Sequence, residues 1–381
     1  MHVAIACGGT GGHAFPGVVT GQVLRRRGHA VTLWLAGRDA ESSVIKDWDG
    51  PVVRLVARGF QEGWTAGGVG IALGHVRAAA QAFSTMRRAR PDVLLGMGSY
   101  STVPPALAAR LLGVPVVLHE ANAVPGSAIS FLARGARSVG IAFATAAEHL
   151  PRTRTVMTGL PMRAFGGEIL RDAPLREGVF TVLIMGGSQG AHALNVLAPA
   201  AVLALHRQGR AVQVIHLSGR ADEGAVRAVY AAAGVPQLVF GFLAEIGGAY
   251  LRADLAVCRS GAGTCMELAR CGLPAILVPL PTARRNHQWH NARELEQRGG
   301  ARVIEQHALS EAGLAEAIGG FMEAPQKLAE IRTALKGMAI ADGAERLADL
   351  VEAAGQSHAS IGKTASGGRG PPRIKTENGE S

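Results

Sequence analysis

The chain contains two copies of one glycine-rich turn, and no other feature of the sequence restricts its fold as strongly. The segments 5–14 (IACGGTGGHA) and 184–193 (IMGGSQGAHA) both pass from an apolar run through Gly-Gly, Ser or Thr and a further Gly to a His and an Ala-rich helix start. Ordering glycine costs backbone entropy, so such a cluster indicates a turn that needs bare backbone or a close approach. Turns of this kind bind phosphate through backbone N–H groups at a helix N-terminus. The sequence therefore predicts two phosphate-binding units in series.

Short apolar runs of β type alternate with helical stretches along most of the chain. These runs occupy 3–7, 30–35, 51–56, 92–97, 115–120, 138–143 and 155–159, and then 180–185, 212–217, 237–242, 254–260, 274–280 and 301–305. Continuous apolar strands separated by helices predict parallel sheets covered on both faces. A chain of 381 residues also exceeds what one core usually supports. We therefore expect an α/β protein with two Rossmann-like, doubly wound domains that face a central cleft.

The domain boundaries follow from the repeat and from composition. We expect an N-terminal domain over 1–164, a C-terminal domain over 165–340, a helix over 341–355 that returns toward the N-terminal domain, and a disordered tail over 356–381. The polar, glycine-containing segment 163–178 is the expected linker. The tail is assigned as disordered because it has almost no apolar side chains.

The charge is concentrated in the first half of the chain. Residues 1–165 carry 17 Lys and Arg against 8 Asp and Glu, whereas residues 166–355 carry 18 against 19. A basic field of this kind suits nucleic acid or anionic lipid, and a solvated surface is the alternative. The segment 71–90 repeats apolar residues at helical spacing and ends in Arg87, Arg88 and Arg90. It fits either a helix on anionic lipid or an ordinary helix packed on its own sheet.

Four cysteines lack the spacing of a disulfide framework or a zinc site, and no signal peptide or membrane-spanning run is visible. We therefore expect a cytoplasmic protein whose membrane contact is peripheral.

Several polar residues follow expected strands, where open α/β sheets bind ligands. His13 is a candidate base or phosphate ligand, since its ordinary pKa lies near neutrality. Glu120 is a secondary catalytic candidate, and Asn122 offers an amide. Carboxylate and amide groups that could bond sugar hydroxyls follow later, at Glu267, Gln288 and Asn291.

Other features of the sequence fit two alternative functions and a metal-binding motif. Residues 9–14 fit the dinucleotide pattern G-x-G-x-x-A, but Arg38 stands near the position of the expected acid, so an NADP-dependent oxidoreductase is one alternative. A noncatalytic lipid- or nucleic-acid-binding protein is the other. Asp47 and Asp49 form a D-x-D in a turn before a strand, where a turn role is favoured. We expect metal-independent chemistry without a cofactor.

Taken in order, the motifs closely resemble one family. They are GGTGGHAFPG (8–17), LLGMGSYSTVP (94–104), VVLHEANAVPG (116–126), GLPMR (159–163), GGSQGA (186–191), VCRSGAGT (257–264) with Glu267, and NHQ (286–288) with Asn291. The chain resembles the MurG family over about residues 2–353. This resemblance implies the GT-B glycosyltransferase fold and an inverting N-acetylglucosaminyltransferase of peptidoglycan synthesis, which serves cell wall biogenesis, cell shape and cell division. It would transfer GlcNAc from UDP-GlcNAc to undecaprenyl-pyrophosphoryl-MurNAc-pentapeptide, turning lipid I into lipid II.

The resemblance also implies roles for individual residues. The acceptor pyrophosphate would lie near Gly11, Gly12 and the GMGSY loop, and His13 would be the base or would orient the acceptor. The residues implied to bind the donor are Thr10, Gly11, Gly12 and Asn122 at the donor end of the cleft, Arg163 and Ser188 at the UDP phosphates, Leu243 at uracil, Glu267 at the ribose, and Ala262, Gln288 and Asn291 at the sugar.

For its surroundings, the resemblance implies a peripheral protein on the cytoplasmic face of the bacterial plasma membrane, an anionic membrane surface as partner, contacts with cell-wall synthesis and division proteins, and no nucleic acid. It favours lipid as the partner of the basic field.

Four positions depart from the family pattern. Ser99 stands where the second Gly of GMGGY is usual, Leu160 replaces the Asn of GNP, AGTCME replaces ALTVSE, and Arg284-Arg285 occupy a place where an acid often precedes NHQ. The Ser99 and arginine positions affect the expected acceptor and sugar contacts rather than the reaction.

Overall fold

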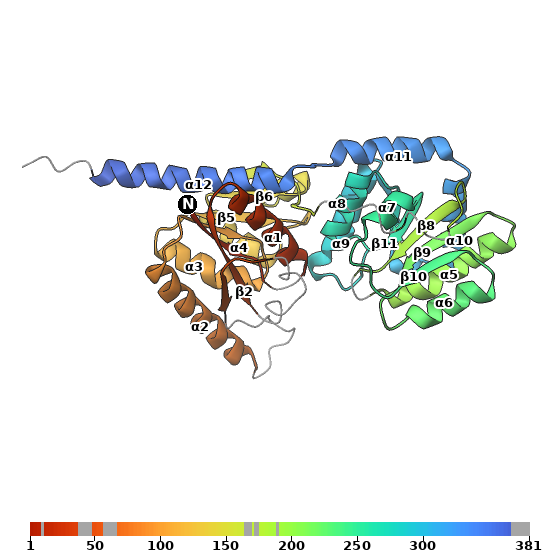
Figure 1. Ribbon diagram of the computed structural model, residues 1–381, viewed down its shortest axis with the longest axis horizontal. Coiled ribbons are helices and arrows are strands. Elements are labelled where there is room, and N and C mark those ends of the chain that lie inside the picture. Colours follow the sequence, from red (N-terminus) through yellow and green to blue (C-terminus); the bar gives the residue numbers. More distant parts are fainter. Residues whose placement is uncertain are drawn as a thin grey trace, which may run out of the picture.

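The computed structural model describes residues 1–8, 11–36, 48–55, 67–163, 170, 175–187 and 190–366. Figure 1 shows two lobes side by side, joined along one edge by the two last helices. Each lobe is built on one parallel sheet covered by helices, as the alternation of apolar runs and helical stretches predicts.

The N-terminal sheet has seven strands within the described residues, in the order β3-β2-β1-β4-β5-β6-β7. The strands are β1 (His2–Ala6), β2 (Ala30–Ala36), β3 (Val52–Leu55), β4 (Val93–Gly96), β5 (Val116–Glu120), β6 (Ser138–Ile141) and β7 (Thr155–Met157). The helices are α1 (Gly11–Arg26), α2 (Gly67–Arg88), α3 (Val103–Leu111) and α4 (Ser127–Leu132), with short 3-10 turns η3 (Tyr100–Thr102), η4 (Ala133–Gly135) and η5 (Ala144–Ala147).

The C-terminal sheet repeats this order with six strands in the described part of the chain, β10-β9-β8-β11-β12-β13. Its strands are β8 (Phe180–Met185), β9 (Val212–Leu217), β10 (Gln237–Phe240), β11 (Leu255–Cys258), β12 (Ala275–Leu277) and β13 (Ala301–Val303). Its helices are α5 (His192–Arg207), α6 (Glu223–Ala232), α7 (Gly247–Arg252), α8 (Ala262–Cys271), α9 (His287–Gln297), α10 (Glu311–Met322) and α11 (Pro325–Met338), with η6 (Arg284–Asn286) and η7 (Gln306–Ala308).

Both sheets are doubly wound, so each has a point where the strand order reverses. In the N-terminal sheet β1 lies between β2 and β4, and in the C-terminal sheet β8 lies between β9 and β11. Every strand pair is parallel, for example Val3 beside both Val31 and Val93. Ligands of such sheets bind outside the carboxyl ends of these central strands. The fold therefore confirms the predicted pair of Rossmann-like domains, and in each lobe a glycine-rich turn follows the central strand, at the end where a ligand crevice is expected.

The last helix, α12 (Gly343–Ser366), leaves the C-terminal lobe and lies along the N-terminal one (Figure 1). Its Leu347 and Val351 are fully buried in a core cluster with Val3 and Ile5 of β1. The helix continues past residue 355, where a disordered tail was expected to begin, so that boundary is wrong. Low apolar content did not prevent helix formation, because residues 356–366 contain no proline and several good helix formers.

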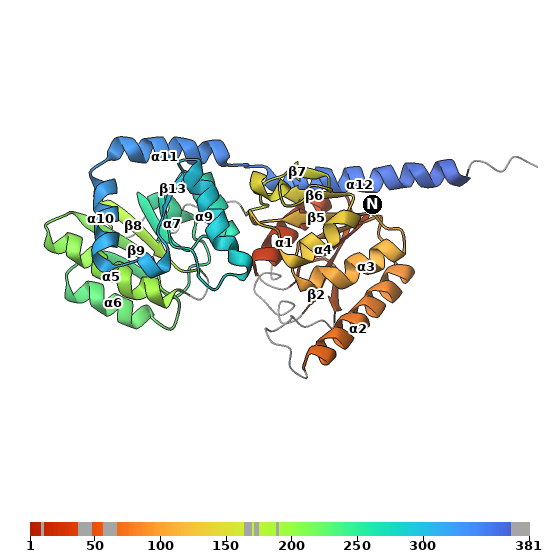
Figure 2. The same ribbon diagram turned by 180° about the vertical axis from the view of Figure 1, so that it is seen from behind.

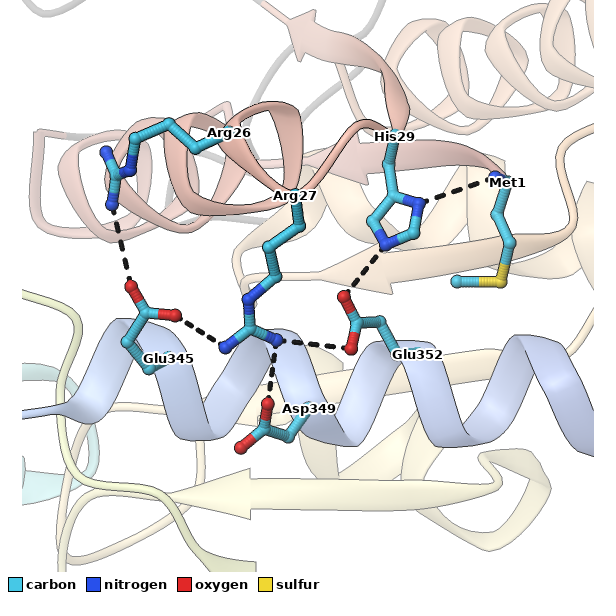
Figure 3. A network of polar contacts seen from close by, with 7 residues as sticks. All are labelled: Met1, Arg26, Arg27, His29, Glu345, Asp349 and Glu352. Atoms are coloured by element: carbon cyan, nitrogen blue, oxygen red, sulfur yellow. Dashed lines mark hydrogen bonds and ion pairs between the residues drawn. The ribbon is translucent and has the colours of Figure 1, made fainter.

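An ion network fastens α12 to the end of α1 (Figure 3). The Arg27 guanidinium donates to Glu345, to Asp349 at 2.7 Å and to Glu352 at 3.1 Å. These carboxylates repeat at positions i, i+4 and i+7, so they share one face of the helix. They raise the pKa of Arg27, the hydrogen bond to Asp349 most strongly.

Replacing Arg27 by methionine should therefore lower the free energy of unfolding by about 1–2 kcal/mol, because three carboxylates would face one another without a cation. The measurement is urea unfolding of the full chain. Arg26→Met is the matched control, since Arg26 makes one 3.6 Å contact with Glu345 from a more exposed side chain. Equal losses in the two variants would contradict the assignment.

Candidate functional site

The first crevice opens where β1 ends. Gly8 lies against the neighbouring strand so closely that a Cβ there would come 2.5 Å from the backbone nitrogen of Ala36, so only glycine fits. Gly11 is partly exposed and Gly12 exposed at the start of α1, which has no acidic residue in its first turn. The helix N-terminus thus presents positive backbone dipoles to the crevice without a carboxylate to cancel them. Thr10 lies outside the described residues.

His13 lies in the first turn of α1 and is partly exposed. Its ring packs on the loop that follows β4, because a Cβ on Gly98 would lie only 3.2 Å from its Cδ2. The buried His119 of β5 is close enough for its pKa to be lowered by His13, after the larger effect of burial, to about 4. His13 therefore stands between the ends of β1, β4 and β5, at the point where the strand order reverses.

The loop after β5 is organised by Glu120. Its Oε1 accepts the backbone N–H of Asn122 at 2.8 Å and the Asn122 amide at 3.1 Å, and its Oε2 accepts the N–H of Gly126 at 2.8 Å. Burial raises the pKa of this carboxyl, and the hydrogen bonds from Asn122 and Gly126 oppose that rise. With both oxygens occupied and the side chain buried, this geometry supports a loop-ordering role. A catalytic role for Glu120 stays a prediction.

The second crevice lies where β8 ends. Gly187 and Gly190 have φ values of +98° and +78°, and a Cβ on Gly190 would lie 2.0 Å from the carbonyl oxygen of Ser218. Both positions therefore require glycine. Ser188 is outside the described residues.

A series of buried hydrogen bonds supports this turn. The Asn195 amide donates to the Ser218 carbonyl and to Asp222, both at 2.7 Å, so its Oδ1 faces Nε2 of His216 at 3.0 Å. His216 must then carry its proton on Nε2 and accept the Tyr230 hydroxyl at Nδ1, 3.1 Å away. Burial lowers the pKa of His216 to about 4.

The low pKa of His216 predicts acid sensitivity. Below pH about 6.5 the unfolded chain binds a proton at this residue, whereas the folded chain does so only near pH 4. The free energy of unfolding should thus fall between these pH values by up to about 3 kcal/mol from this group. His216→Gln should reduce this slope in urea titrations at pH 7 and 4.5, although it lowers stability at pH 7. An unchanged slope would contradict the prediction.

α8 follows β11, the strand that pairs with β8 beside the second glycine-rich turn. Gly261 is its N-cap, and Ala262, its first residue, is partly exposed. One turn further on, Glu267 accepts the Tyr250 hydroxyl at 2.7 Å, and burial raises its pKa. Leu243 is partly buried beside the exposed Phe242. Gln288 is partly buried, and its Oε1 accepts the N–H of Leu280 at 2.9 Å.

Arg163 is exposed between the lobes, with its guanidinium 4.5 Å from the ring centroid of Phe15 on α1. This cation–π contact joins the GLPMR segment to the first turns of α1. Arg163 also lines a cleft of about 530 Å³ between the lobes, together with one face of α1, Met162, Glu245, Arg270 and the start of α12.

The loop after β5 contacts the C-terminal lobe across the boundary of the lobes. Asn291 of α9 is fully buried and is hydrogen-bonded to Asn122 and Ala123, in the loop after β5. Contact between Asn291 and a sugar would require these bonds to open. The loops after the carboxyl ends of β5, β11 and β12 therefore lie together at the boundary, as a shared site requires.

Known proteins share the sequence and the fold of this chain. Residues 3–141 match the glycosyltransferase family 28 N-terminal domain, and residues 181–347 match its C-terminal domain. The chain is 41% identical over 365 residues, 93% of this chain and 92% of the relative, to the UDP-N-acetylglucosamine–N-acetylmuramyl-(pentapeptide) pyrophosphoryl-undecaprenol N-acetylglucosamine transferase of Rhodospirillum rubrum. The crystal structure of Acinetobacter baumannii MurG superposes with a TM-score of 0.77 at 30% identity, covering 92% of this chain and 99% of that one.

The chain belongs to the MurG family.

More distant structures share the fold alone. The calicheamicin glycosyltransferase CalG4 superposes with a TM-score of 0.67 at 16% identity over 92% of this chain and 97% of that one. The GT-B fold expected from the sequence is therefore confirmed, and membership of the MurG family replaces the oxidoreductase and the noncatalytic binding protein as alternatives.

Ser99, which departs from the MurG pattern, has a strained backbone conformation. Ser99 has φ 66° and ψ 166°, a conformation that glycine adopts far more easily than serine. It is held by a hydrogen bond from its Oγ to the Gly8 carbonyl at 2.8 Å, which joins the GMGSY loop to the first glycine turn.

Ser99→Gly should have a higher free energy of unfolding than Ser99→Ala by about 1–3 kcal/mol, because both variants lose the hydroxyl that bonds the Gly8 carbonyl and Ser101, and glycine alone relieves the strain. Ser99→Ala is the matched control: it keeps the strain and loses the hydrogen bonds of the hydroxyl, so it should also be less stable than the native chain. Thermal unfolding of the three proteins tests this prediction. A Ser99→Ala variant more stable than Ser99→Gly would contradict the backbone strain.

Sequence reasoning missed several residues that build the site. Among them are Phe15 under Arg163, Ser101, which bonds the Gly8 carbonyl, the Asn195–His216 pair, and the buried Arg259, which donates to the Val278 and Pro279 carbonyls and to Gln306. A signal existed for two of them, because His216 and Arg259 interrupt or end apolar strands where a polar residue needs a partner.

The remaining expectations concern metals and the membrane. Of Asp47 and Asp49, only Asp49 is described, and it forms an ion pair with Arg25, which fits a turn role. Within the described ranges, no three His, Cys, Asp or Glu side chains gather as metal ligands; metal-independent chemistry stays a prediction. No helix in the described part is long and apolar enough to cross a membrane.

Proposed function

We propose that this chain transfers GlcNAc from UDP-GlcNAc to the C4 hydroxyl of MurNAc in undecaprenyl-pyrophosphoryl-MurNAc-pentapeptide, and so converts lipid I to lipid II in peptidoglycan synthesis. One observation carries the proposal: a chain of the MurG family, 41% identical to the Rhodospirillum rubrum transferase over 93% of its length, has a glycine-rich turn directly after the central strand of each doubly wound sheet, where such sheets bind ligands. The N-terminal crevice suits the acceptor, and the C-terminal crevice suits the donor.

The chemistry is a single displacement. The C4 hydroxyl oxygen attacks the anomeric carbon of GlcNAc, the bond from that carbon to the UDP phosphate oxygen breaks, and the hydroxyl proton passes to a base. His13 is the proposed base, because it lies in the first turn of α1, after the first glycine-rich turn and against the loop that follows β4. Alignment and neutralisation of the leaving diphosphate supply the rest of the acceleration.

The donor roles proposed for individual residues follow the C-terminal crevice. Ser188 and Arg163 would hold the UDP phosphates, Leu243 would contact uracil, and Glu267 would accept ribose hydroxyls. Ala262, Gln288 and Asn291 would contact GlcNAc, and Asn122 would line the donor end of the cleft. On the N-terminal side, Thr10, Gly11 and Gly12 would surround the diphosphates with backbone N–H groups.

A membrane surface is proposed for the outer face of the N-terminal lobe. Val76 of α2, Leu111 of α3 and Phe131 of α4 are 66%, 78% and 62% exposed. Arg87, Arg88 and Arg110 are exposed on the same helices, and these helices lie together in Figure 2. Apolar side chains with neighbouring arginines suit anionic lipid, which would bring the crevice to its lipid-linked acceptor. Contacts with cell-wall synthesis and division proteins stay a prediction.

The deciding experiment measures release of UDP from UDP-GlcNAc by the full chain, with and without a lipid I analogue. Acceptor-dependent release that persists in EDTA is the expected result. Release that needs no acceptor, or none at all with either substrate present, would refute the proposal, and dependence on added metal would refute the metal-independent mechanism.

A further inference from the structure

A cationic segment of the C-terminal lobe contacts the N-terminal lobe at the boundary between them. Arg284, Arg285 and Asn286 form η6 and are exposed, and α9 begins directly after them. The Arg285 guanidinium donates from Nη1 to the Ser130 hydroxyl of α4 at 3.3 Å, although the two residues are 155 positions apart. The segment 281–293 contains no acidic residue. The C-terminal lobe therefore presents positive charge to α4 across the boundary.

The backbone of η6 holds Arg285 in an unusual conformation. Arg285 has φ 52° and ψ 24°, and Asn286 has φ 53° and ψ 30°, so two successive residues other than glycine are left-handed. Asparagine adopts this conformation readily, whereas an arginine does so at a cost in free energy. Strained residues of this kind gather at functional sites, where the surrounding structure fixes their side chains. In η6 the strained residue is the one whose side chain reaches the other lobe.

The bond to Ser130 uses only part of the Arg285 guanidinium, which carries five N–H donors. In the part of the chain that the structure describes, no acidic side chain pairs with it. Arg134 follows Ser130 by one helical turn along α4 and η4 and is also exposed, so it lies on the same side of this helical run. Cations from both lobes thus flank the boundary, and guanidinium groups bind carboxylates through two parallel hydrogen bonds.

The proposed acceptor carries a carboxylate that can reach η6. In a muramyl-pentapeptide the peptide is joined through its N-terminus to a lactyl group on O3, beside the C4 hydroxyl that reacts, so its C-terminal carboxylate is free. An extended pentapeptide spans up to about 17 Å. Arg285 precedes Gln288 and Asn291, which are proposed to contact GlcNAc, by about 5–10 Å at the rise of a helix. A MurNAc whose C4 hydroxyl faces the donor sugar therefore has its peptide within reach of these arginines.

We propose that Arg284 and Arg285, together with Arg134 across the boundary, bind the carboxylate of the acceptor's peptide and so set the preference of this chain among acceptors. The inference rests on the proposed function, because it concerns another part of the same acceptor. It is specific to this chain, since the acid that often precedes NHQ in the family pattern would repel the same carboxylate. One exposed ion pair contributes little to binding, but several cations that converge on one anion contribute more.

An anionic lipid headgroup is the other partner that exposed arginines suit. The geometry favours the peptide, because the Arg285 side chain is bonded across the boundary between the lobes. Cations that bind a membrane lie on an outward face, as is proposed for Arg87 and Arg88 of α2. The experiment below therefore measures acceptor preference without a membrane and lipid binding without an acceptor.

The experiment compares water-soluble acceptors that carry a short prenyl chain on the pyrophosphate. One bears the pentapeptide with free carboxylates, the second bears the same peptide with its carboxylates amidated, and the third has no peptide. UDP release by the full chain gives the KM of each acceptor. The native chain should have a KM about 3- to 20-fold lower for the free carboxylates than for the amidated peptide. This preference should diminish as the salt concentration rises, because the arginines are exposed.

Variants of the full chain test which cations produce the preference. Arg285→Met should lose most of it, Arg285→Lys should keep much of it, and Arg285→Glu should reverse it, so that the amidated peptide has the lower KM. Arg284→Met and Arg134→Met should each lose part of it. Arg207→Met is the matched control and should retain the native preference. Arg207 is exposed in the last turn of α5, which lies on the side of its lobe away from the N-terminal lobe (Figure 1; Figure 2).

The outcomes separate this inference from the proposed function. A native chain that uses free and amidated peptides with equal KM, or an Arg285→Glu variant with the native preference, would overturn the inference and leave the proposed function intact. Binding to vesicles of phosphatidylglycerol and phosphatidylcholine is measured in parallel. If the arginine variants lose vesicle binding but keep the acceptor preference, the arginines bind lipid and the inference fails. A native chain that releases no UDP with any acceptor would overturn the proposed function and the inference together.

Discussion

Replacing His13 by alanine is expected to lower turnover by about 100- to 10,000-fold, the usual range for loss of a general base, and to change UDP affinity little. The residue lies on the N-terminal lobe in the first turn of α1, against Gly98, whereas the C-terminal lobe supplies the proposed contacts to uracil and ribose and, through Ser188, one to the UDP phosphates. Turnover and binding should thus separate. UDP release with a lipid I analogue gives the first quantity, and calorimetric titration with UDP gives the second.

Two further variants make this result specific. His13→Gln keeps a hydrogen-bonding side chain without a base of suitable pKa, so it should remain almost as slow as His13→Ala if proton transfer is the role, and should recover much of the rate if His13 only orients the acceptor. His307→Ala, at an exposed histidine on η7, should retain native kcat. Parallel losses of turnover and UDP binding in His13→Ala would assign the residue to structure instead.

Replacing Glu267 by alanine is expected to weaken binding of UDP by about 10- to 100-fold, which corresponds to loss of a charge-assisted hydrogen bond of about 1.5–3 kcal/mol. Glu267 is oriented by the Tyr250 hydroxyl at 2.7 Å and is otherwise set among apolar groups of α8 and β11. Since burial raises its pKa, the affinity for UDP should also fall as the pH drops toward that raised value, because the protonated carboxyl accepts hydrogen bonds poorly.

The ribose itself supplies the control for this prediction. The native chain should prefer UDP to 2′-deoxy-UDP or 3′-deoxy-UDP, and Glu267→Ala should lose the preference for whichever hydroxyl the carboxylate accepts. Tyr250→Phe, which removes only the orienting hydroxyl, should weaken UDP binding by a smaller factor and keep the preference. Calorimetric titrations with the three nucleotides give all of these values, and a Glu267→Ala protein that still discriminates as the native chain does would refute the ribose role.

Much of the fold could be predicted because its signals are local. Each expected apolar run became a strand at or within a few residues of the expected position, since a short apolar run of β type is a property of the segment itself. The duplicated glycine turns were equally readable, because tight contacts at Gly8 and Gly190 leave no space for a Cβ. The helical segment 356–366 does not follow from apolar content, because helix propensity and apolar content are independent.

The candidate site could be predicted less completely, since its side chains interact with distant partners. The motifs identified Glu120, Asn122 and Asn291 as polar residues after strands, but Ala123 and Asn291 are 168 positions apart, and no local pattern pairs them. Nor does a sequence pattern show that both carboxylate oxygens of Glu120 accept hydrogen bonds from the loop that follows it. The pKa changes of His119, His216 and Glu267 arise from burial, which a sequence does not state.

For this protein the sequence alone determined the two doubly wound domains, the glycine turns and the family, because strand pattern, turn geometry and motif order are written in neighbouring residues. Only the tertiary structure decided that Asn291 is shared between the lobes, that α12 is fastened to α1 by Arg27, and that Ser99 holds a glycine conformation. Hydrogen bonds and desolvation depend on which atoms meet in space, and that is set when the chain has folded.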